Sequence, residues 1–224
     1  MWLGGTEAVN HTTLNHFRQA HGEALRELFA QLLTLLEQAG LMNLERVMHD
    51  GTKIEAQAGS DTFRREKTVR ERLARARELV RRLEQEPERE RKGRQPAAQE
   101  RALREQHQRL EKALEELQRM QAQQAEKDPA EVRVSLSDPE ARIMKHGDQA
   151  IGPAYTLQIP TDAKEKVIVG MQVNQCSSDA PALEQALVEL EQGLGRRPRQ
   201  AVVDGGYTTQ DNVILAAERE IDLI

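Results

Sequence analysis

The chain has 224 residues, of which 31% are charged and only 3% aromatic, and its formal net charge is −5. This length allows one large domain or two small ones, and the net charge excludes a uniformly basic nucleic-acid-binding chain. Cys176 is the sole cysteine, which excludes an internal disulfide and suits a reducing cytosol. No apolar run approaches the ~18–20 residues that a membrane span requires, so we expect no membrane partner.

The N-terminal part is predicted to form a helix followed by a strand. Residues 11–40 are expected to be helical, because apolar side chains recur at spacings of three and four and build one wide face: Leu25, Leu28, Phe29, Leu32, Leu33 and Leu36. Gly40 is expected to end this helix. The short apolar run from Val47 to Ile54 is the first strand candidate, and residues 55–63 are predicted to form a loop.

Residues 66–128 are expected to form an antiparallel helical hairpin. Two series of apolar residues have heptad spacing, and glycine and prolines between residues 86 and 96 separate them. The first series is Val69, Leu73, Ala76, Val80 and Leu83, and the second is Leu103, Leu110, Leu114 and Leu117. Residues 64–104 carry 15 Lys or Arg against 8 Asp or Glu, an excess of seven positive charges that allows a polyanionic partner. The alternative is a solvated helix face without a ligand.

The remaining chain alternates between short apolar runs and helical patterns. In chain order we expect an extended piece at 132–136, a turn or short helix at 138–145, a β-hairpin of 155–159 and 166–173, a helix at 182–194, a strand at 201–203, a helix at 208–219 and a strand at 221–224. This order predicts an α/β protein with a mixed sheet. Right-handed crossovers would make the strands at 167–173, 201–203 and 221–224 parallel.

Two aspartates are the first candidates for chemistry. Asp50 and Asp204 each close a short apolar run and each precede a glycine. Carboxylates at the ends of adjacent strands can hold a divalent cation, and hard oxygen ligands suit Mg²⁺ or Mn²⁺. Asp-Gly is equally a common turn sequence, and spacing does not show that the two strands are neighbours. His49 would face the other side of its strand from Asp50, so we expect it to pack rather than to bind.

Two cations near the middle of the chain are candidates for phosphate contact. Arg142 and Lys145 are three residues apart, and on a helical turn this spacing could grip one phosphate. The alternative is that both are solvated surface side chains.

Several motifs, in this order, resemble bacterial insertion-sequence transposases of the DDE type. They are residues 10–18 (Asn-His-Thr-Thr-Leu-Asn-His-Phe-Arg), 50–54 (Asp-Gly-Thr-Lys-Ile), 60–65 (Ser-Asp-Thr-Phe-Arg-Arg), 137–145 (Ser-Asp-Pro-Glu-Ala-Arg-Ile-Met-Lys), 152–158 (Gly-Pro-Ala-Tyr-Thr-Leu-Gln) and 203–207 (Val-Asp-Gly-Gly-Tyr). The resemblance extends from about residue 2 to the end of the chain. Several ordered motifs together are more specific than any one of them.

The resemblance implies an RNase H-like catalytic domain in which two aspartates and one glutamate bind two divalent metal ions, Mg²⁺ or Mn²⁺, for cutting and joining DNA. By motif position Asp50 and Asp204 are the expected catalytic and metal-binding aspartates. The motif residues Arg64, Arg65, Arg142 and Lys145 are the expected DNA contacts, which would position the DNA without reading its sequence.

The expected organisation is an N-terminal helical segment (1–42), an incomplete RNase H-like mixed sheet (43–64 and 130–224) and a helical-hairpin insertion after the first strand (65–129). The family's third carboxylate follows the last strand, so we expect it beyond Ile224, and a further helical region before Trp2. The resemblance thus implies a partial, inactive transposase in the bacterial cytoplasm at the nucleoid, with transposon-end and target DNA and a second copy of the chain as partners. The alternative functions are a non-catalytic DNA-binding fragment and a coiled-coil interaction fragment.

Overall fold

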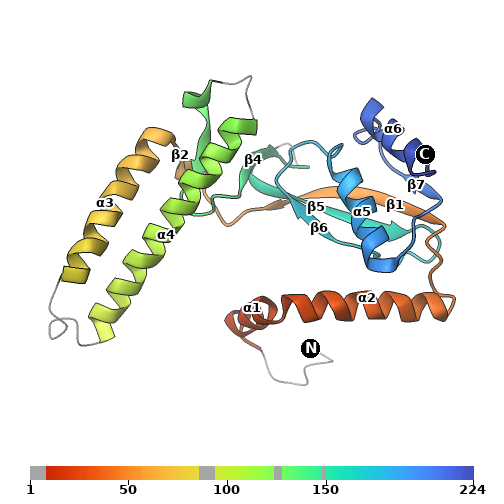
Figure 1. The fold of residues 1–224 in the computed structure, drawn as a ribbon, viewed down its shortest axis with the longest axis horizontal. Coiled ribbons are helices and arrows are strands. Elements are labelled where there is room, and N and C mark those ends of the chain that lie inside the picture. The colour runs from red at the N-terminus through yellow and green to blue at the C-terminus, as the bar shows by residue number, and fades with distance from the viewer. Residues whose placement is uncertain (1–8, 86–93, 124–127, 148–149) are drawn as a thin grey trace. The chain divides into compact units, whose positions relative to one another are not determined.

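The computed structural model describes residues 9–85, 94–123, 128–147 and 150–224 (Figure 1). The chain divides into two compact units. The first contains the residues up to Asp50, then Gln158–Gln172 and Asp179–Ile224, and the second contains Gly51–Leu157 and Val173–Ser178. No helix in the described ranges is both long and apolar enough to cross a membrane. The three-segment division expected from the sequence stays a prediction.

The N-terminal helix of the first unit is broken once. It forms α1 (His11–Ala20) and α2 (Gly22–Gln38) instead of one continuous helix, and the break lies at His21. Gly40 ends α2 as expected, with a φ of 72°. The amide of Gly40 donates to the carbonyl of Glu37 and that of Leu41 to the carbonyl of Leu36, each at 2.9 Å. These two bonds form a Schellman motif, which satisfies the last carbonyls of the helix.

The apolar face of α2 is only partly buried. Leu33 is its one buried residue, and it packs in a cluster with Met42, Leu44, Val47, Val169 and Leu190. Leu28 and Leu32, which the spacing also assigned to this face, are more than half exposed. The predicted periodicity is therefore present, but its burial against the strands is limited to one edge of the helix.

A mixed sheet contains six strands, and its main order is β4-β5-β1-β7-β8, with β6 paired to β5. The strands are β1 (Arg46–Glu55), β4 (Arg142–Lys145), β5 (Ile151–Asp162), β6 (Gln172–Asn174), β7 (Gln200–Val202) and β8 (Asp222–Leu223). β1 pairs with β7 in parallel, and β7 pairs with β8 in parallel. β1 and β5 are antiparallel, because the amide of Ala163 donates to the carbonyl of Arg46 and that of Ala56 donates to Pro153. The expected α/β class with a mixed sheet is confirmed.

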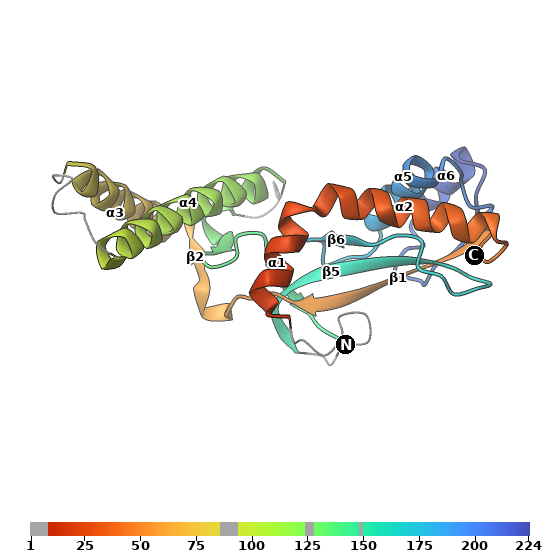
Figure 2. The ribbon, with the colours of Figure 1, turned by 90° about the horizontal axis from the view of Figure 1, so that it is seen from below.

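Two helices of the first unit pack on the same side of its strands as α2 does (Figure 2). α5 (Ala182–Leu194) has the predicted bounds, and α6 (Gln210–Glu218) lies within its predicted range. Both contribute to one cluster whose members are Leu183, Leu187, Ala201, Tyr207, Ala216 and Ile221. Gly195 ends α5 in the left-handed conformation, and Thr209 caps α6 by accepting from the amide of Asn212. Helices therefore cover the sheet face to which Val47 and His49 point.

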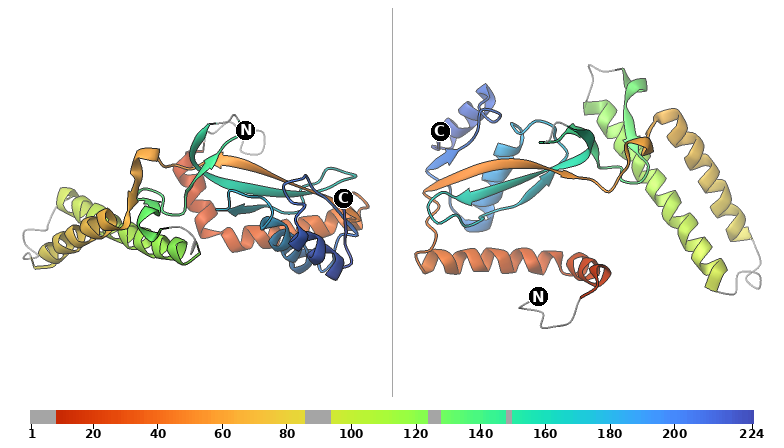
Figure 3. Two further views of the ribbon diagram at one scale, coloured as in Figure 1. Left: turned by 90° about the horizontal axis from the view of Figure 1, so that it is seen from above. Right: turned by 180° about the vertical axis from the view of Figure 1, so that it is seen from behind.

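The second unit contains the expected helical hairpin. α3 (Glu66–Gln85) and α4 (Arg94–Gln123) lie side by side and run in opposite directions (Figure 3). The two predicted apolar series face each other and build the clusters that contain Val69, Leu73, Ala76, Leu110, Ala113 and Leu117. The hairpin packs on a small antiparallel sheet of β2 (Phe63–Arg65) and β3 (Arg133–Ser135). Short 3₁₀ turns, η1 (Ser60–Thr62) and η2 (Pro129–Glu131), precede the two strands.

The segment around residue 142 differs from its prediction. A turn or short helix was expected at 138–145, but Arg142–Lys145 form β4, which pairs with β5 in antiparallel register from Arg142 opposite Ala154 to Lys145 opposite Ile151. Successive residues of a strand point to opposite faces, so Arg142 and Lys145 do not lie on one face as they would on a helical turn. The expectation that they grip one phosphate together is therefore wrong in its geometry.

Candidate functional site

The first unit places Asp50 and Asp204 on neighbouring strands. In the parallel pair of β1 and β7, Val47 lies opposite Ala201 and Met48 lies opposite Val202. Two residues further along each segment lie Asp50 and Asp204, which are both exposed. β7 ends at Val202, so Asp204 lies beyond the paired residues. Adjacent parallel strands are about 4.8 Å apart. The spacing left open whether the two strands are neighbours, and the sheet shows that they are.

The position of Asp50 corrects one detail of the sequence analysis. Asp50 was expected at the end of a strand, but β1 extends from Arg46 to Glu55, so Asp50 lies in its middle. Only Asp204 follows the end of its strand, two residues after Val202.

Asp204 also has the turn contacts that an Asp-Gly sequence predicts. Its Oδ1 accepts from the amide of Gly206 at 2.8 Å, and its carbonyl accepts from the amide of Tyr207 at 3.1 Å. The hydroxyl of Thr208 donates to the same carbonyl at 3.3 Å. One carboxylate oxygen of Asp204 therefore holds the turn between β7 and α6.

A third aspartate, Asp179, lies beside this turn. A methyl group built on Gly206 would lie 3.0 Å from Asp204 Oδ1 and 4.0 Å from Asp179 Oδ2, so both carboxylates border the same glycine. Asp179 Oδ1 accepts from Nε2 of Gln158 at 3.1 Å, which fixes its side chain against β5. Asp179 is not among the residues predicted from the sequence, because it lies in the loop before α5 and no strand or motif marks it.

Two buried polar residues, Tyr207 and Gln158, hold the carboxylate of Asp179. The hydroxyl of Tyr207, which is fully buried, donates to Oε1 of Gln158, and Gln158 in turn binds Asp179. Burial raises the pKa of the Tyr207 hydroxyl well above its usual value, and Asp179 adds to this shift. Tyr207 is therefore a neutral hydrogen-bond donor that positions Gln158, and it stays protonated at physiological pH.

His49 packs on the edge of Tyr207, as strand alternation predicts. Its ring centroid lies 5.0 Å from that of Tyr207 at an interplanar angle of 85°, and only 4% of the residue is exposed. Burial lowers the pKa of His49 below 6.5, although Gln158, Asp50 and Asp179 oppose this shift. A neutral, packed imidazole on the face opposite Asp50 agrees with a structural role.

This arrangement suits a divalent cation in part. Asp50 and Asp204 carry carboxylates, the kind of hard oxygen ligand that Mg²⁺ and Mn²⁺ prefer. In the described part of the chain, no group of three or more His, Cys, Asp or Glu side chains is arranged to hold a metal ion. Two carboxylates would fill only part of the oxygen-ligand shell of such an ion, and water or phosphate oxygens would have to complete it.

The expected DNA contacts Arg64 and Arg65 lie on β2 in the second unit. Nη1 of Arg64 donates to the backbone carbonyls of Asp61 and Phe63, so its charge has no carboxylate partner in these contacts. Arg65 pairs with Glu131 at 2.7 Å, and both side chains are about half exposed. Exposed pairs of this kind contribute little to stability. The two arginines thus differ, because only Arg65 is neutralised by a carboxylate.

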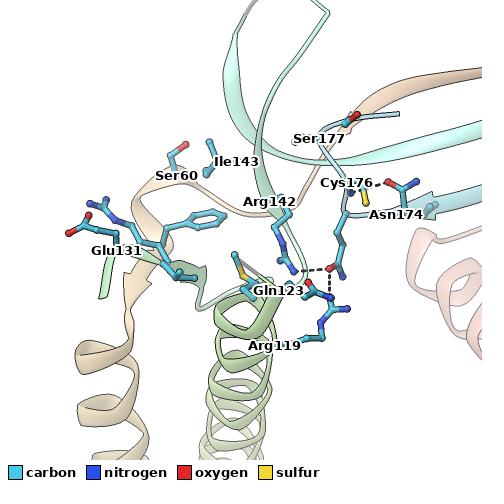
Figure 4. Close-up of a pocket in the computed structure, with 16 residues that line it drawn as sticks. Ser60, Arg119, Gln123, Glu131, Arg142, Ile143, Asn174, Cys176 and Ser177 are labelled. Carbon is cyan, nitrogen blue, oxygen red and sulfur yellow. Dashed lines mark hydrogen bonds between the residues drawn. The ribbon is translucent and has the colours of Figure 1, made fainter. Parts of the chain in front are cut away.

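Arg142 is part of a dense network beside a pocket of about 930 Å³ (Figure 4). Its guanidinium donates to Glu116 and Gln175 and to the carbonyls of Pro139, Glu140 and Ala141. The side chains of Arg142 and Glu116 are only 14% and 12% exposed. Burial acts to raise the pKa of Glu116, but bonds from Arg119 and Arg142 hold it below its ordinary value. These contacts describe a structural cation, whereas Lys145 is exposed.

The fold is that of a mixed α/β protein with parallel strands β1, β7 and β8. Comparison of the chain with protein-family models, with curated proteins and with solved structures finds no match.

Proposed function

We propose that this chain is part of a DDE-type DNA transposase and that Asp50 and Asp204 are two of its metal-binding carboxylates. The observation that carries the proposal is the parallel pairing of β1 with β7, because Asp50 lies on β1 and Asp204 lies two residues after the end of β7. The two motif aspartates are more than 150 residues apart in the sequence, and we infer that this pairing brings them near each other. The mixed sheet, the ordered motifs and the helical hairpin that follows β1 all support an RNase H-like reading.

In this proposal Asp50 and Asp204 hold Mg²⁺ or Mn²⁺ and aim it at a DNA phosphodiester. The metal would stabilise charge on the reacting oxygens and lower the pKa of bound water. Asp204 is held by the Gly206 amide, and Asp50 lies within a paired strand. The turn contact therefore holds the carboxylate of Asp204, and the strand holds the backbone of Asp50, which would limit the reorganisation required when a metal binds. Such a protein acts on DNA in the bacterial cytoplasm.

The test is the metal dependence of DNA binding. Fluorescence anisotropy with a labelled duplex should show tighter binding in Mn²⁺ than in EDTA at constant ionic strength, because a cation held by Asp50 and Asp204 would attract the phosphates of the duplex. Asp50→Asn and Asp204→Asn should each remove this gain. Asp222→Asn is the matched control, since Asp222 is also exposed and lies on the neighbouring strand β8. The same metal-dependent gain in all four proteins would contradict the proposal.

The proposal also includes an incomplete active site. With two carboxylates and no third metal-binding side chain grouped with them in the described residues, we expect the purified chain to cleave DNA at a negligible rate. Robust Mg²⁺-dependent nicking that Asp50→Ala abolishes would show that the site is complete after all.

The alternative of a coiled-coil interaction fragment has less support. The buried residues of both apolar series already pack against each other within the hairpin, including Val69, Leu110 and Leu117. A second copy of the chain would have to dock on another surface. The DNA-binding alternative and the main proposal would both use the basic second unit.

A further inference from the structure

A second pocket of the second unit gathers three arginines from three different elements. The pocket has a volume of about 300 Å³ and is lined by Asp61, Thr62, Arg64, Arg72, Gln106, Arg109, Leu110, Leu136 and Ser137. Arg64 comes from β2, Arg72 from α3 and Arg109 from α4. Three different elements therefore contribute positively charged residues to the lining of one pocket. Like charges that lie close together cost free energy unless an anion or water screens them.

The charges around this pocket are poorly balanced. Asp61 is the single acidic residue among the described lining residues, against three arginines. Nη1 of Arg64 donates to the neutral carbonyls of Asp61 and Phe63. Within the described residues, neither Arg72 nor Arg109 forms an ion pair. Other arginines of the hairpin differ, because Arg82 pairs with Glu78 and Arg104 with Glu100.

The rest of the lining suits an oxyanion. Ser137 contributes a hydroxyl and Gln106 an amide that can donate, whereas the hydroxyl of Thr62 already donates to the carbonyl of Gly59 at 2.7 Å. The hydroxyl of Thr62 lies 2.8 Å from that of Ser135, and Ser135 Oγ accepts from the amides of Ser137 and Asp138. This network fixes the wall between η1 and β3. Guanidiniums from several directions, with neutral donors between them, are the usual ligands of a phosphate group.

We propose that Arg64, Arg72 and Arg109 form a phosphate-binding pocket that holds a phosphodiester of DNA. The size is at the lower end of ligand pockets, which suits one backbone phosphate with its sugar. The excess of two positive charges fits the single negative charge of a phosphodiester with solvent around it. This inference rests on the proposed function only for the source of the phosphate, since the chemistry of the pocket itself recognises any phosphate.

The experiment compares two double variants of the full chain. Arg72→Gln with Arg109→Gln removes two exposed pocket arginines, and Arg82→Gln with Arg104→Gln removes two exposed, carboxylate-paired arginines from the same two helices. Both change the net charge equally. The pocket variant should bind a labelled duplex at least about tenfold more weakly and lower the salt slope of log Kd by about 2, as expected for two lost phosphate contacts. The control should lose less than about twofold.

The source of the phosphate is settled by competition. Inorganic phosphate should displace the duplex from the wild-type chain more effectively than sodium chloride at equal ionic strength, and this difference should vanish in the pocket variant. Phosphate competition without any loss of duplex affinity in the pocket variant would assign the pocket to free phosphate and overturn the DNA reading. Equal losses in both double variants, or no specific phosphate competition, would overturn the pocket itself.

A separate variant distinguishes this inference from the metal proposal. Asp50→Asn in EDTA should bind the duplex as the wild-type chain does, because Asp50 belongs to the other unit. A normal arginine dependence together with no metal effect would refute the metal site and leave the pocket intact. A metal-dependent gain in DNA affinity together with no loss of affinity in the pocket variant would refute the pocket alone.

Discussion

His49 and Asp50 are neighbours in sequence and have opposite environments. Strand alternation buries His49 against Tyr207 and exposes Asp50 on the other face. Burial lowers the pKa of His49 below the ordinary 6.5, so the folded chain prefers the neutral imidazole. The unfolded chain binds a proton more readily, and below pH 6.5 this difference favours unfolding.

The resulting prediction concerns the pH dependence of stability. The contribution of His49 to the free energy of unfolding is fully present above pH 6.5. It is lost as the pH falls from 6.5 towards the lowered pKa of the folded state. In urea titrations this group adds a slope of at most about 1.4 kcal/mol per pH unit, the value for one proton. His49→Leu should flatten the slope between pH 6.5 and 5.5, and His16→Leu, on the exposed helix α1, should not. An unchanged slope in His49→Leu would refute this role.

At the scale of elements, local patterns in the sequence were the most informative where packing is also local. The helix at residues 182–194 was predicted with its bounds, because its apolar spacing and the terminal Gly195 act within one element. The hairpin was predicted for the same reason, since its two apolar series need only each other.

Non-local pairing explains the elements that were missed. Residues 138–145 contain a Pro-Glu-Ala sequence that is typical of a helix start, but pairing of Arg142–Lys145 with β5 makes them a strand. The continuation of β1 past Asp50 likewise depends on β5, where Ala56 donates to Pro153. Asp179 was missed because only the tertiary structure brings its loop to Gly206.

Replacing either of two glycines near the end of α5 should change the free energy of unfolding, in opposite directions. Gly195 has a φ of 65°, which an L-residue adopts at a cost, so Gly195→Ala should lower the free energy of unfolding by about 1 kcal/mol. Gly193 lies inside the helix with nothing within 4 Å of an added methyl group. Gly193→Ala should therefore raise the free energy of unfolding by up to about 1 kcal/mol. Chemical denaturation followed by circular dichroism measures both, and a shift of the same sign in the two variants would contradict the assigned cap.

At the scale of the whole molecule, the two units contain different sets of charged residues. The first has Asp50 on β1 and Asp204 just after the neighbouring strand β7, and the second has a pocket lined by three arginines and one aspartate. The sequence predicted Asp50, Asp204 and Arg64 from motifs, but it could not show which strands and helices are neighbours. That information lies in the register of β1 with β7 and in the packing of α3 and α4 on β2 and β3.

The central claim is that Asp50 and Asp204 form one divalent-metal site, and paramagnetic broadening by Mn²⁺ tests it most directly. At substoichiometric Mn²⁺, amide resonances of Asp50, Asp204 and Gly205 should broaden before those of other exposed acidic positions, such as Asp222. Asp204→Asn should abolish this selective broadening, while Asp222→Asn should leave it unchanged. Broadening spread evenly over exposed carboxylates, or centred elsewhere and unaffected by Asp204→Asn, would contradict the account.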